Sequence, residues 1–364
     1  MKISPQRASR LIKALRGRRI GVVGDLMLDR YLWGTATRLS PEAAVPVVDF
    51  VEQSECLGGV GNVAANLAAL GARVTLFGVV SEDEAAVALR KCLAALGLTT
   101  AGVIGDATRT TTVKTRVIAR HQQVVRVDRE NRAPLRKPTE DRLIRRIKAA
   151  LGHLDALVVS DYDKGVVTEA LAERVMTECH RLGVPSFVKP KTSRLFFYRG
   201  ATTVVCNSKE AGFFVTRTLA DDESVEQAGR SLLAHFGCSA VVITRGEQGM
   251  SLFEDTASGK DEPAAKTPPR ALHIPPTSFE VSYARVGLPG FDSGTRRRGR
   301  GRQVFDVTGA GDTVLATLAL AVAAGASLRE AAVLANAAAG VVVGKLGTAT
   351  VLPAELLAAV RELE

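Results

Sequence analysis

The chain has 364 residues, of which 46% are hydrophobic, and a formal net charge of +10 at pH 7. This apolar content is enough for one large α/β domain or two ordinary ones, and no apolar stretch reaches the roughly 18–20 residues that a membrane helix needs. The basic N-terminus lacks the apolar core of an export signal, and the five scattered cysteines form no Cys-x-x-Cys pair. These features predict a cytoplasmic protein with reduced thiols and no membrane segment.

Much of the positive charge lies in one segment. Residues 296–302 hold five arginines in seven positions, and removing them would lower the net charge from +10 to +5. The remaining charge is spread over helix-like segments, which usually form solvated faces. The composition therefore favours a solvated basic loop over a nucleic-acid interface, although RNA binding through the arginine tract stays an alternative.

The first quarter of the chain begins with a short helix near 11–15 and a buried strand over 18–24. Asp25 and Asp29 follow that strand, and in open α/β sheets ligands bind at the carboxyl ends of strands. Apolar residues alternate over 45–51 and again over 113–128, where two strands are expected with a break near 120–123. Because one face of these strands is polar, we expect a small separate sheet that covers a site.

A glycine-rich stretch, residues 58–62, comes before a helix that ends near Gly71 and a strand over 73–80. Gly59, Gly61 and Ala64 have the spacing of a dinucleotide-binding fingerprint. That fingerprint requires a strand immediately before it, and residues 53–57 do not read as one, so we reject this interpretation. A turn that brings the backbone close to a ligand, with Asn62 as a hydrogen-bonding residue, fits better. A simple packing turn before a helix stays open.

From residue 142 onward, helices and strands alternate. Strands are expected over 156–160, 185–189, 202–206 and 240–244, and this repetition predicts a doubly wound, mostly parallel sheet with helices on both faces. Residues 340–346 resemble a P-loop, but the stretch is one residue short and Leu346 replaces the Ser or Thr that would hold magnesium.

Residues 304–325 carry the most specific pattern. Gly309 and Gly311 allow a tight turn, and apolar residues then recur at helical spacing up to Gly325. The turn would lie at a helix N-terminus, where free N–H groups attract anions. An aspartate there, Asp312, suits a base that takes a proton from a hydroxyl attacking a phosphoryl group. An ordinary acid in the first turn of a buried helix is the alternative.

The stretch from Asp306 to Thr313 (Asp-Val-Thr-Gly-Ala-Gly-Asp-Thr) resembles the signature of the ribokinase-like (PfkB) carbohydrate kinases. The resemblance extends from Gly24 to Val351. A narrower likeness, to the heptose 7-phosphate kinases, rests on the motifs at residues 24–34, 38–43, 122–123, 160–165 and 247–250. It implies ATP-dependent phosphorylation of the anomeric hydroxyl of D-glycero-D-manno-heptose 7-phosphate to the 1,7-bisphosphate, a step toward lipopolysaccharide core heptose. Kinases for ribose or fructose 6-phosphate are the alternative, and an RNA-binding or scaffold protein on a kinase fold is a remote one.

The resemblance also implies an organisation. We expect one ribokinase-like domain over 1–364, with lid strands near 30–52 and 113–128 and a homodimer formed through the lid. In many relatives the kinase is fused to an adenylyltransferase domain. Because this chain ends at Glu364, soon after the kinase motifs, it resembles the stand-alone form.

The resemblance assigns roles by position. Asp312 would be the base, with anion-hole amides from Gly309, Ala310 and Gly311. The sugar phosphate would contact Asp25, Asp29, Gly59 and Asn62, and its 7-phosphate would meet Lys114 and Arg116. Asn207 and Glu210 would organise Mg²⁺ and the ATP phosphates, and the nucleotide would also contact Thr244, Gly246, Gly249 and Asn336. A potassium ion could bind beside Asp306 and Thr308.

Two departures from the family pattern stand out. Relatives usually carry Asp-Pro-Lys-Gly where this chain has Lys189-Pro190-Lys191-Thr192, which puts a water-mediated contact to magnesium or ATP in doubt. About 25 residues are inserted near 277–302, and their Gly, Ser, Pro and Arg content predicts a mobile surface loop. The arginines could draw ATP toward the site by long-range attraction, or the insertion could be passive.

Overall fold

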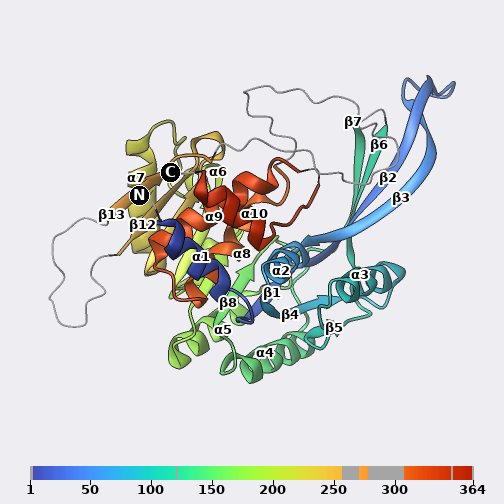
Figure 1. Ribbon diagram of the computed structural model, residues 1–364. Helices are drawn as coiled ribbons and strands as arrows, with labels where there is room; N and C mark the ends of the chain where they lie inside the picture. Colours follow the sequence, from blue (N-terminus) through green and yellow to red (C-terminus); the bar gives the residue numbers. More distant parts are fainter. Residues whose placement is uncertain (1–2, 120–121, 256–269, 278–306, 346, 363–364) are drawn as a thin grey trace.

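The protein is a layered α/β molecule with a separate small sheet (Figure 1). A computed structural model describes residues 3–119, 122–255, 270–277, 307–345 and 347–362. The large sheet has nine strands in the order β13-β12-β11-β10-β9-β8-β1-β4-β5. Of the basic loop predicted near 277–302, residues 278–302 lie outside the described residues, as does Asp306.

The central strands are parallel and buried, as the predicted βα repeats require. They are short and rich in valine, and they read as continuous apolar runs because helices cover both faces. Only the pairs β11–β12 and β12–β13 are antiparallel among the described strands of this sheet. The strands are β1 (Arg19–Gly24), β4 (Arg73–Val80), β5 (Val103–Gly105), β8 (Ala156–Ser160), β9 (Ser186–Lys189), β10 (Thr203–Asn207), β11 (Ala240–Thr244), β12 (Met250–Glu254) and β13 (Arg270–Ile274).

The helices form two layers, and each layer packs its own apolar cluster against the sheet. One layer holds α1 (Pro5–Ala14), α2 (Val60–Ala69), α3 (Glu84–Ala95), α8 (Ala310–Ala323), α9 (Leu328–Val342) and α10 (Pro353–Arg361). The other holds α4 (Lys137–Leu151), α5 (Glu169–Leu182), α6 (Ser208–Phe214) and α7 (Asp222–Phe236), with two short 3-10 turns, η1 (Thr192–Tyr198) and η2 (Gly246–Gln248), between strands. Helix α8 is buried along most of its length, so its N-terminus is held rigidly.

The second sheet has four strands in the order β3-β2-β6-β7 and projects from one end of the layered body (Figure 1). Its strands are β2 (Leu26–Leu39), β3 (Pro46–Gly59), β6 (Thr112–Ala119) and β7 (Gln122–Arg129). Strands β2 and β6 run parallel, while β2–β3 and β6–β7 are antiparallel. The predicted pair of strands over 113–128 and the small separate sheet are confirmed, and we call this sheet the lid.

One prediction from the sequence is wrong. Residues 53–57 belong to β3, although they do not read as a strand. Their polar side chains have cross-strand partners, since Glu55 pairs with Arg30 and Ser54 accepts a hydrogen bond from the indole of Trp33. A strand therefore does precede Gly59. It is an antiparallel lid strand rather than the first strand of a parallel βαβ unit, so the dinucleotide interpretation still fails.

Two other sequence expectations agree with the structure. Residues 328–342 form one helix that runs through Gly340, so the P-loop-like stretch does not wrap a phosphate. All five cysteines are free thiols, and Cys179, Cys206 and Cys238 are buried.

Within the described ranges, no helix is both long enough and apolar enough to cross a membrane.

Candidate active site

The carboxyl ends of the parallel strands place several polar residues along one edge of the large sheet. Strand β1 leads to Asp25, β8 to Asp161, and β9 ends at Lys189. Further along the same edge, β10 ends at Asn207 and β11 at Thr244, and these two residues are paired in register. This is the edge where ligands bind in open α/β sheets.

Asp312 lies in the first turn of α8, directly after the predicted glycine turn. Gly309 is the N-cap residue with φ +82°, a left-handed conformation that glycine adopts without strain. A methyl group on Gly309 would lie 2.6 Å from the Asn62 amide nitrogen, so only glycine lets Asn62 approach. The Asp312 side chain is 7% exposed. Glycine at 309 therefore serves both the turn and the contact that follows.

Three side chains hold the Asp312 carboxylate. Asn62 Nδ2 donates to Oδ2 at 3.0 Å, Tyr162 Oη donates to Oδ1 at 2.5 Å, and Lys189 Nζ donates to Oδ1 at 2.8 Å. The Lys189 ammonium also lies 5.5 Å from the centre of the Tyr162 ring. A buried carboxylate is stable only with such partners. Three different parts of the chain therefore fix the orientation of this one acid.

The protonation of the two neighbours follows from their surroundings. Burial and the charge of Asp312 raise the pKa of Tyr162 well above its ordinary value. The phenol therefore stays protonated, and its O–H donates a hydrogen bond to Asp312. Burial lowers the pKa of Lys189, but Asp312 and Glu210 outweigh that effect and the pKa is raised overall. At neutral pH Lys189 is therefore an ammonium and Tyr162 a neutral phenol, and both lie against Asp312.

Helix α2 is tied to α8 by a buried amide network. Asn66 Nδ2 donates to the backbone oxygen of Asn62 at 3.0 Å, and Thr313 Oγ1 donates to Asn66 Oδ1 at 2.9 Å. This network orients Asn62 toward Asp312. The sequence predicted a sugar contact for Asn62; the structure places its amide against Asp312, and a sugar contact stays a prediction.

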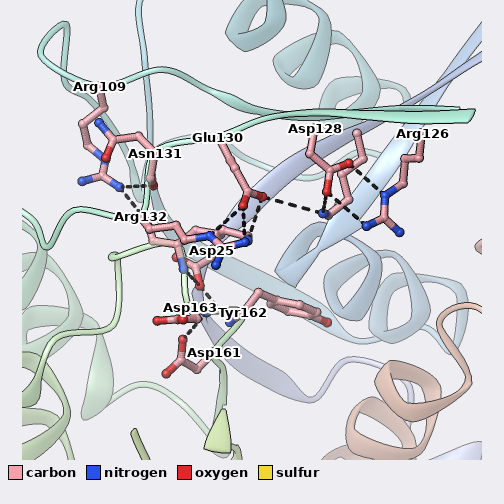
Figure 2. Close-up of polar contacts among 12 residues, drawn as sticks. Asp25, Arg109, Arg126, Asp128, Glu130, Asn131, Arg132, Asp161, Tyr162 and Asp163 are labelled. Carbon is pink, nitrogen blue, oxygen red and sulfur yellow. Dashed lines mark hydrogen bonds and ion pairs between the residues drawn. The ribbon is translucent and has the colours of Figure 1, made fainter. Parts of the chain in front are cut away.

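Asp25 anchors the loop after β8. Its carboxylate is buried and accepts backbone N–H bonds from Tyr162, Lys164 and Val166 at 2.8, 3.2 and 3.1 Å. In Figure 2 the ring of Tyr162 points away from the acids of this turn. Burial and the charge of Asp161 raise the pKa of Asp25, the three amides oppose the rise, and the resulting pKa is about 6. The observed contacts make Asp25 a support for the loop that carries Tyr162; its predicted sugar contact is not tested.

Gly59 also has a structural explanation. It is the N-cap of α2 with φ +56°, and a methyl group there would lie 2.5 Å from the Asp25 backbone oxygen. The close approach that glycine allows is thus to the Asp25 main chain. The packing-turn alternative accounts for this residue without a ligand.

The lid contributes the other predicted sugar-phosphate residues. Arg116 Nη1 lies 2.6 Å from Asp29 Oδ1, and its guanidinium lies 5.3 Å from the centre of the Tyr31 ring. Lys114 lies 2.9 Å from Asp128 and 3.8 Å from Glu130. Both predicted phosphate-binding cations therefore already have carboxylate partners, which a substrate phosphate would have to share or replace.

Glu130 connects the lid to the loop after β8. It lies 2.7 Å from Lys164 Nζ and 2.7 Å from Arg132, and Figure 2 shows these contacts beside the Asp128–Arg126 pair. Arg109 adds a second link, since it donates to the backbone oxygens of Asn131 and Lys164 at 3.1 and 2.6 Å. The base of the lid is therefore joined to the loop that carries Tyr162.

Asn207 and Glu210 form the N-terminal capping box of α6. Asn207 Oδ1 accepts from the Glu210 N–H at 2.9 Å, and Glu210 Oε2 accepts from the Asn207 N–H at 2.9 Å. Lys191 Nζ lies 3.6 Å from Glu210 Oε1. A capping box alone explains this pair, and a phosphate or magnesium contact would be an added role for its remaining oxygens.

The remaining predicted nucleotide residues lie at the end of β11, in the turn that follows it, and on α9. Gly246 and Gly249 both have positive φ, and a methyl group on Gly249 would lie 2.1 Å from the Ile274 oxygen. Asn336 on α9 donates to the Pro275 oxygen at 2.8 Å. Thr244 donates to the Cys206 oxygen at 3.5 Å, and Thr308 is exposed. These contacts position loops, and Asp306, the other predicted potassium ligand, lies outside the described residues.

Of the three amides of the predicted anion hole, that of Ala310 already donates a hydrogen bond within the protein. The Ala310 N–H donates to the Val307 oxygen at 3.3 Å, and the Asp312 N–H donates to the Gly309 oxygen at 2.9 Å. Across the described residues, no group of three or more His, Cys, Asp or Glu side chains could hold a metal ion.

Two residues at the centre of the site were not predicted to act there. Tyr162 lies in the motif at 160–165, and Lys189 stands where the family pattern has an aspartate. The signal that could have found both is their position, because each follows or ends a central parallel strand at the ligand-binding edge.

Comparison with known proteins agrees with this architecture. Solved structures with the same fold include Arabidopsis thaliana ribokinase complexed with ribose and ATP, with a TM-score of 0.67, 17% identity, and coverage of 95% of this chain and 99% of that one. Phosphofructokinase-2 from Escherichia coli, in complex with substrates and products, also gives a TM-score of 0.67 at 17% identity, covering 95% of this chain and 98% of that one. At this identity the likeness establishes the ribokinase-like fold.

Other relatives, found by sequence, share more identical residues with the chain than these structures do. The chain is 44% identical to the bifunctional protein HldE of Trichlorobacter lovleyi over 339 residues, which are 93% of this chain and 62% of that protein. It is 43% identical to the bifunctional protein HldE of Methylococcus capsulatus, over 94% of this chain and 64% of that protein. The chain thus spans less than two thirds of the length of these relatives. The model of the pfkB family carbohydrate kinases matches residues 18–270 and 293–355. The chain therefore belongs to the pfkB family of carbohydrate kinases, phosphotransferases that act on an alcohol group.

Proposed function

We propose that this kinase transfers the γ-phosphoryl group of ATP to the anomeric hydroxyl of D-glycero-D-manno-heptose 7-phosphate, giving the 1,7-bisphosphate for lipopolysaccharide core synthesis. The observation that carries the proposal is the position of Asp312. Its carboxylate lies in the first turn of α8 at the ligand-binding edge of the sheet, and it is oriented by Asn62, Tyr162 and Lys189. Such an orientation suits an acid with a chemical task better than a surface acid.

In this proposal Asp312 accepts the proton of the attacking sugar hydroxyl. A carboxylate has about four lone-pair positions, and the described contacts use three of them, so Asp312 can also accept the hydroxyl hydrogen bond. The buried amide network of Asn62, Asn66 and Thr313 holds Asn62 in position to donate to the acid. The positive end of α8, with the Gly309 and Gly311 amides, would stabilise the transferred phosphoryl group.

We assign the nucleotide phosphates to the edge formed by the ends of β10 and β11. Glu210 and Asn207 provide hard oxygen atoms there, which suit Mg²⁺ when most of its ligands are phosphate oxygens and waters. Bound in this way, Mg²⁺ would supply charge neutralisation to the transferred group. Thr244, Gly246, Gly249 and Asn336 would line the rest of the nucleotide site, and a potassium ion beside Thr308 stays part of the proposal.

The choice of a heptose phosphate rests on the HldE relatives and on the lid. The lid face that carries Asp29, Tyr31 and Arg116 also carries Lys114 and Arg126, so cations and an aromatic ring occur together. Charge-assisted hydrogen bonds from such cations contribute roughly 1.5–3 kcal/mol each. This face therefore suits a sugar that carries a distal phosphate.

The proposal also concerns the compartment, the domain organisation and the oligomeric state of the enzyme. We place the enzyme in the cytoplasm, where ATP is available, and treat the described residues as one kinase domain with its lid. We expect a homodimer formed through the lid. RNA binding on a kinase fold is not favoured, because the site retains an oriented acid that RNA binding would not need.

The test is an ADP-release assay over a panel of sugars. Heptose 7-phosphate, the unphosphorylated heptose, ribose and fructose 6-phosphate are compared at equal concentration, and the product is identified by mass and by its phosphorus NMR signal. We expect turnover with heptose 7-phosphate at least tenfold above the others. Equal efficiency on the two heptoses, or a preference for ribose or fructose 6-phosphate, would reject the heptose-phosphate assignment while leaving the kinase family intact.

A further inference from the structure

Lys189 occupies an unusual place for a lysine. It is the last residue of β9, in the middle of the large sheet, and its side chain is only 18% exposed. Burying an ammonium is costly unless it is paired, and here the partner is the Asp312 carboxylate at 2.8 Å. The lysine therefore points directly into the reacting centre that the proposed function assigns to Asp312.

The ammonium also lies against the helix turn that would receive the phosphoryl group. A methyl group on Gly311 would lie 3.2 Å from Lys189 Nζ, so the ammonium is next to the first turn of α8. That turn carries the positive end of the helix dipole. Two positive features meet at one point, and such a combination favours a bound anion with more charge than the single carboxylate of Asp312.

We propose that Lys189 is a catalytic residue, whose ammonium binds an oxygen of the phosphoryl group during its transfer to the sugar. This inference rests on the proposed role of Asp312. As the nucleotide and sugar bind, Lys189 shares its hydrogen bonds between Asp312 and the phosphoryl oxygen. The bond from the γ-phosphorus to the bridging oxygen of ADP breaks, a bond to the sugar oxygen forms, and the hydroxyl proton passes to Asp312. Lys189 keeps its three protons throughout.

The alternative is that Lys189 only neutralises a buried acid. The two roles predict different effects of Lys189 on the binding of ATP and ADP. A neutralising lysine would affect ATP and ADP alike, because its partner is Asp312 in both complexes. A lysine that binds the transferred group would affect ATP and leave ADP unchanged, because ADP lacks that group. The raised pKa of Lys189 means that the side chain is charged at neutral pH under either role.

The experiment removes Asp312 as a partner and then asks what Lys189 still does. In the Asp312→Asn protein, which has no carboxylate to neutralise, ATP and ADP affinities are measured by calorimetry with Mg²⁺ and the sugar phosphate present. Lys189→Met is then added, and Lys148→Met, on the exposed face of α4, is the matched control. We expect Lys189→Met to weaken ATP binding roughly 10- to 100-fold, the effect of one charge-assisted hydrogen bond, with ADP and the control unchanged.

Equal losses for ATP and ADP, or no loss for either, would overturn the proposal. In the protein with Asp312 intact, Lys189→Met should lower kcat by a similar factor, and Lys189→Arg should recover part of it. Thermal unfolding of each variant identifies any that does not fold, and the arginine variant then carries the test. If the native protein phosphorylates no sugar of the panel, the proposed function fails, whereas the ATP-against-ADP comparison still decides the role of Lys189.

Discussion

At the scale of single residues, Asp312 is the position on which the proposed chemistry depends most. Asp312→Asn keeps the shape of the side chain but cannot accept the hydroxyl proton. We expect turnover to fall ~10²–10⁴-fold, the usual contribution of a general base, while ATP and sugar affinities change little. Steady-state kinetics with calorimetry on the same preparations checks this. A variant that kept near-normal turnover would mean that another group is the base.

Asp25 gives a second residue-scale prediction, on stability. Its carboxylate is buried, and its pKa rises from 3.8 to about 6 on folding. A raised pKa means that the folded state binds the proton more tightly, so this group's contribution falls as pH rises from about 4 to about 6. At 1.36 kcal/mol per unit, the loss is about 3 kcal/mol. Well below pH 3.8 the group contributes nothing to the pH dependence, because it is protonated in both states.

Asp25→Asn isolates this effect, because asparagine does not titrate. We expect the free energy of unfolding of the native protein, minus that of the variant, to decrease by about 3 kcal/mol between pH 3 and pH 7. The variant is less stable at every pH, since its amide cannot accept all three N–H bonds from the loop. Urea unfolding at several pH values measures both proteins. A difference that stays constant over this range would contradict the raised pKa.

At the scale of elements, the sequence predicted the central strands well, because buried parallel strands are apolar runs that are followed by polar residues. Strands β4, β8 and β11 have the predicted bounds. The lid strand β3 was predicted too short, since residues 53–57 carry polar side chains whose partners lie on β2. The alternation of apolar residues did not reveal β2, which only the family resemblance indicated through the lid strands expected near 30–52. Local pattern cannot show a partner that is distant in sequence.

The same limit applies to the site. Asp312 could be predicted because its glycine turn and helix are contiguous with it in sequence. The contacts of Lys189 and Tyr162 with Asp312 could not, because they join β9 and the loop after β8 to α8 across more than a hundred residues. The contact between Asn62 and Asp312 likewise depends on the packing of α2 on α8.

The link between the lid and the body gives a prediction about elements. Glu130 is partly buried and lies 2.7 Å from Lys164 and from Arg132. Burial raises the pKa of Glu130, but these cations outweigh it and the pKa is lowered overall. We expect Glu130→Gln to lower the free energy of unfolding at pH 7 by roughly 1–3 kcal/mol, because it leaves the buried Lys164 without its carboxylate partner.

The pH dependence and a control sharpen this test. A group with a lowered pKa contributes stability above its unfolded value, here 4.5, and loses it as pH falls further, so the native protein and Glu130→Gln should converge in acid. Glu42→Gln, at an exposed position near the tip of the lid, is the matched control and should match the native protein at both pH values. If the free energies of unfolding of the native protein and Glu130→Gln differ equally at pH 4 and pH 7, the charge of Glu130 does not stabilise the protein.

At the scale of the whole molecule, the lid is a four-stranded sheet with exposed apolar side chains. Val125 and Val127 on β7 are 47% and 58% exposed, and Phe50 and Val51 on β3 are 65% and 67% exposed. Apolar side chains gathered on a projecting sheet indicate an interaction surface. The edges of this sheet, β3 and β7, also carry unpaired backbone groups that a second copy could pair with.

We therefore expect the proposed homodimer to form through the lid, and charges placed there should dissociate it. Val125→Asp with Val127→Asp introduces two like charges on one face of β7, because these residues alternate with Arg126. Light scattering coupled to size exclusion, at micromolar concentrations, should give twice the chain mass for the native protein and the single chain mass for the double variant. Leu182→Asp, at the end of α5 and 37% exposed, is the control and should remain a dimer. A native protein that runs as a monomer, or a double variant that remains dimeric, would exclude the lid as the dimer contact.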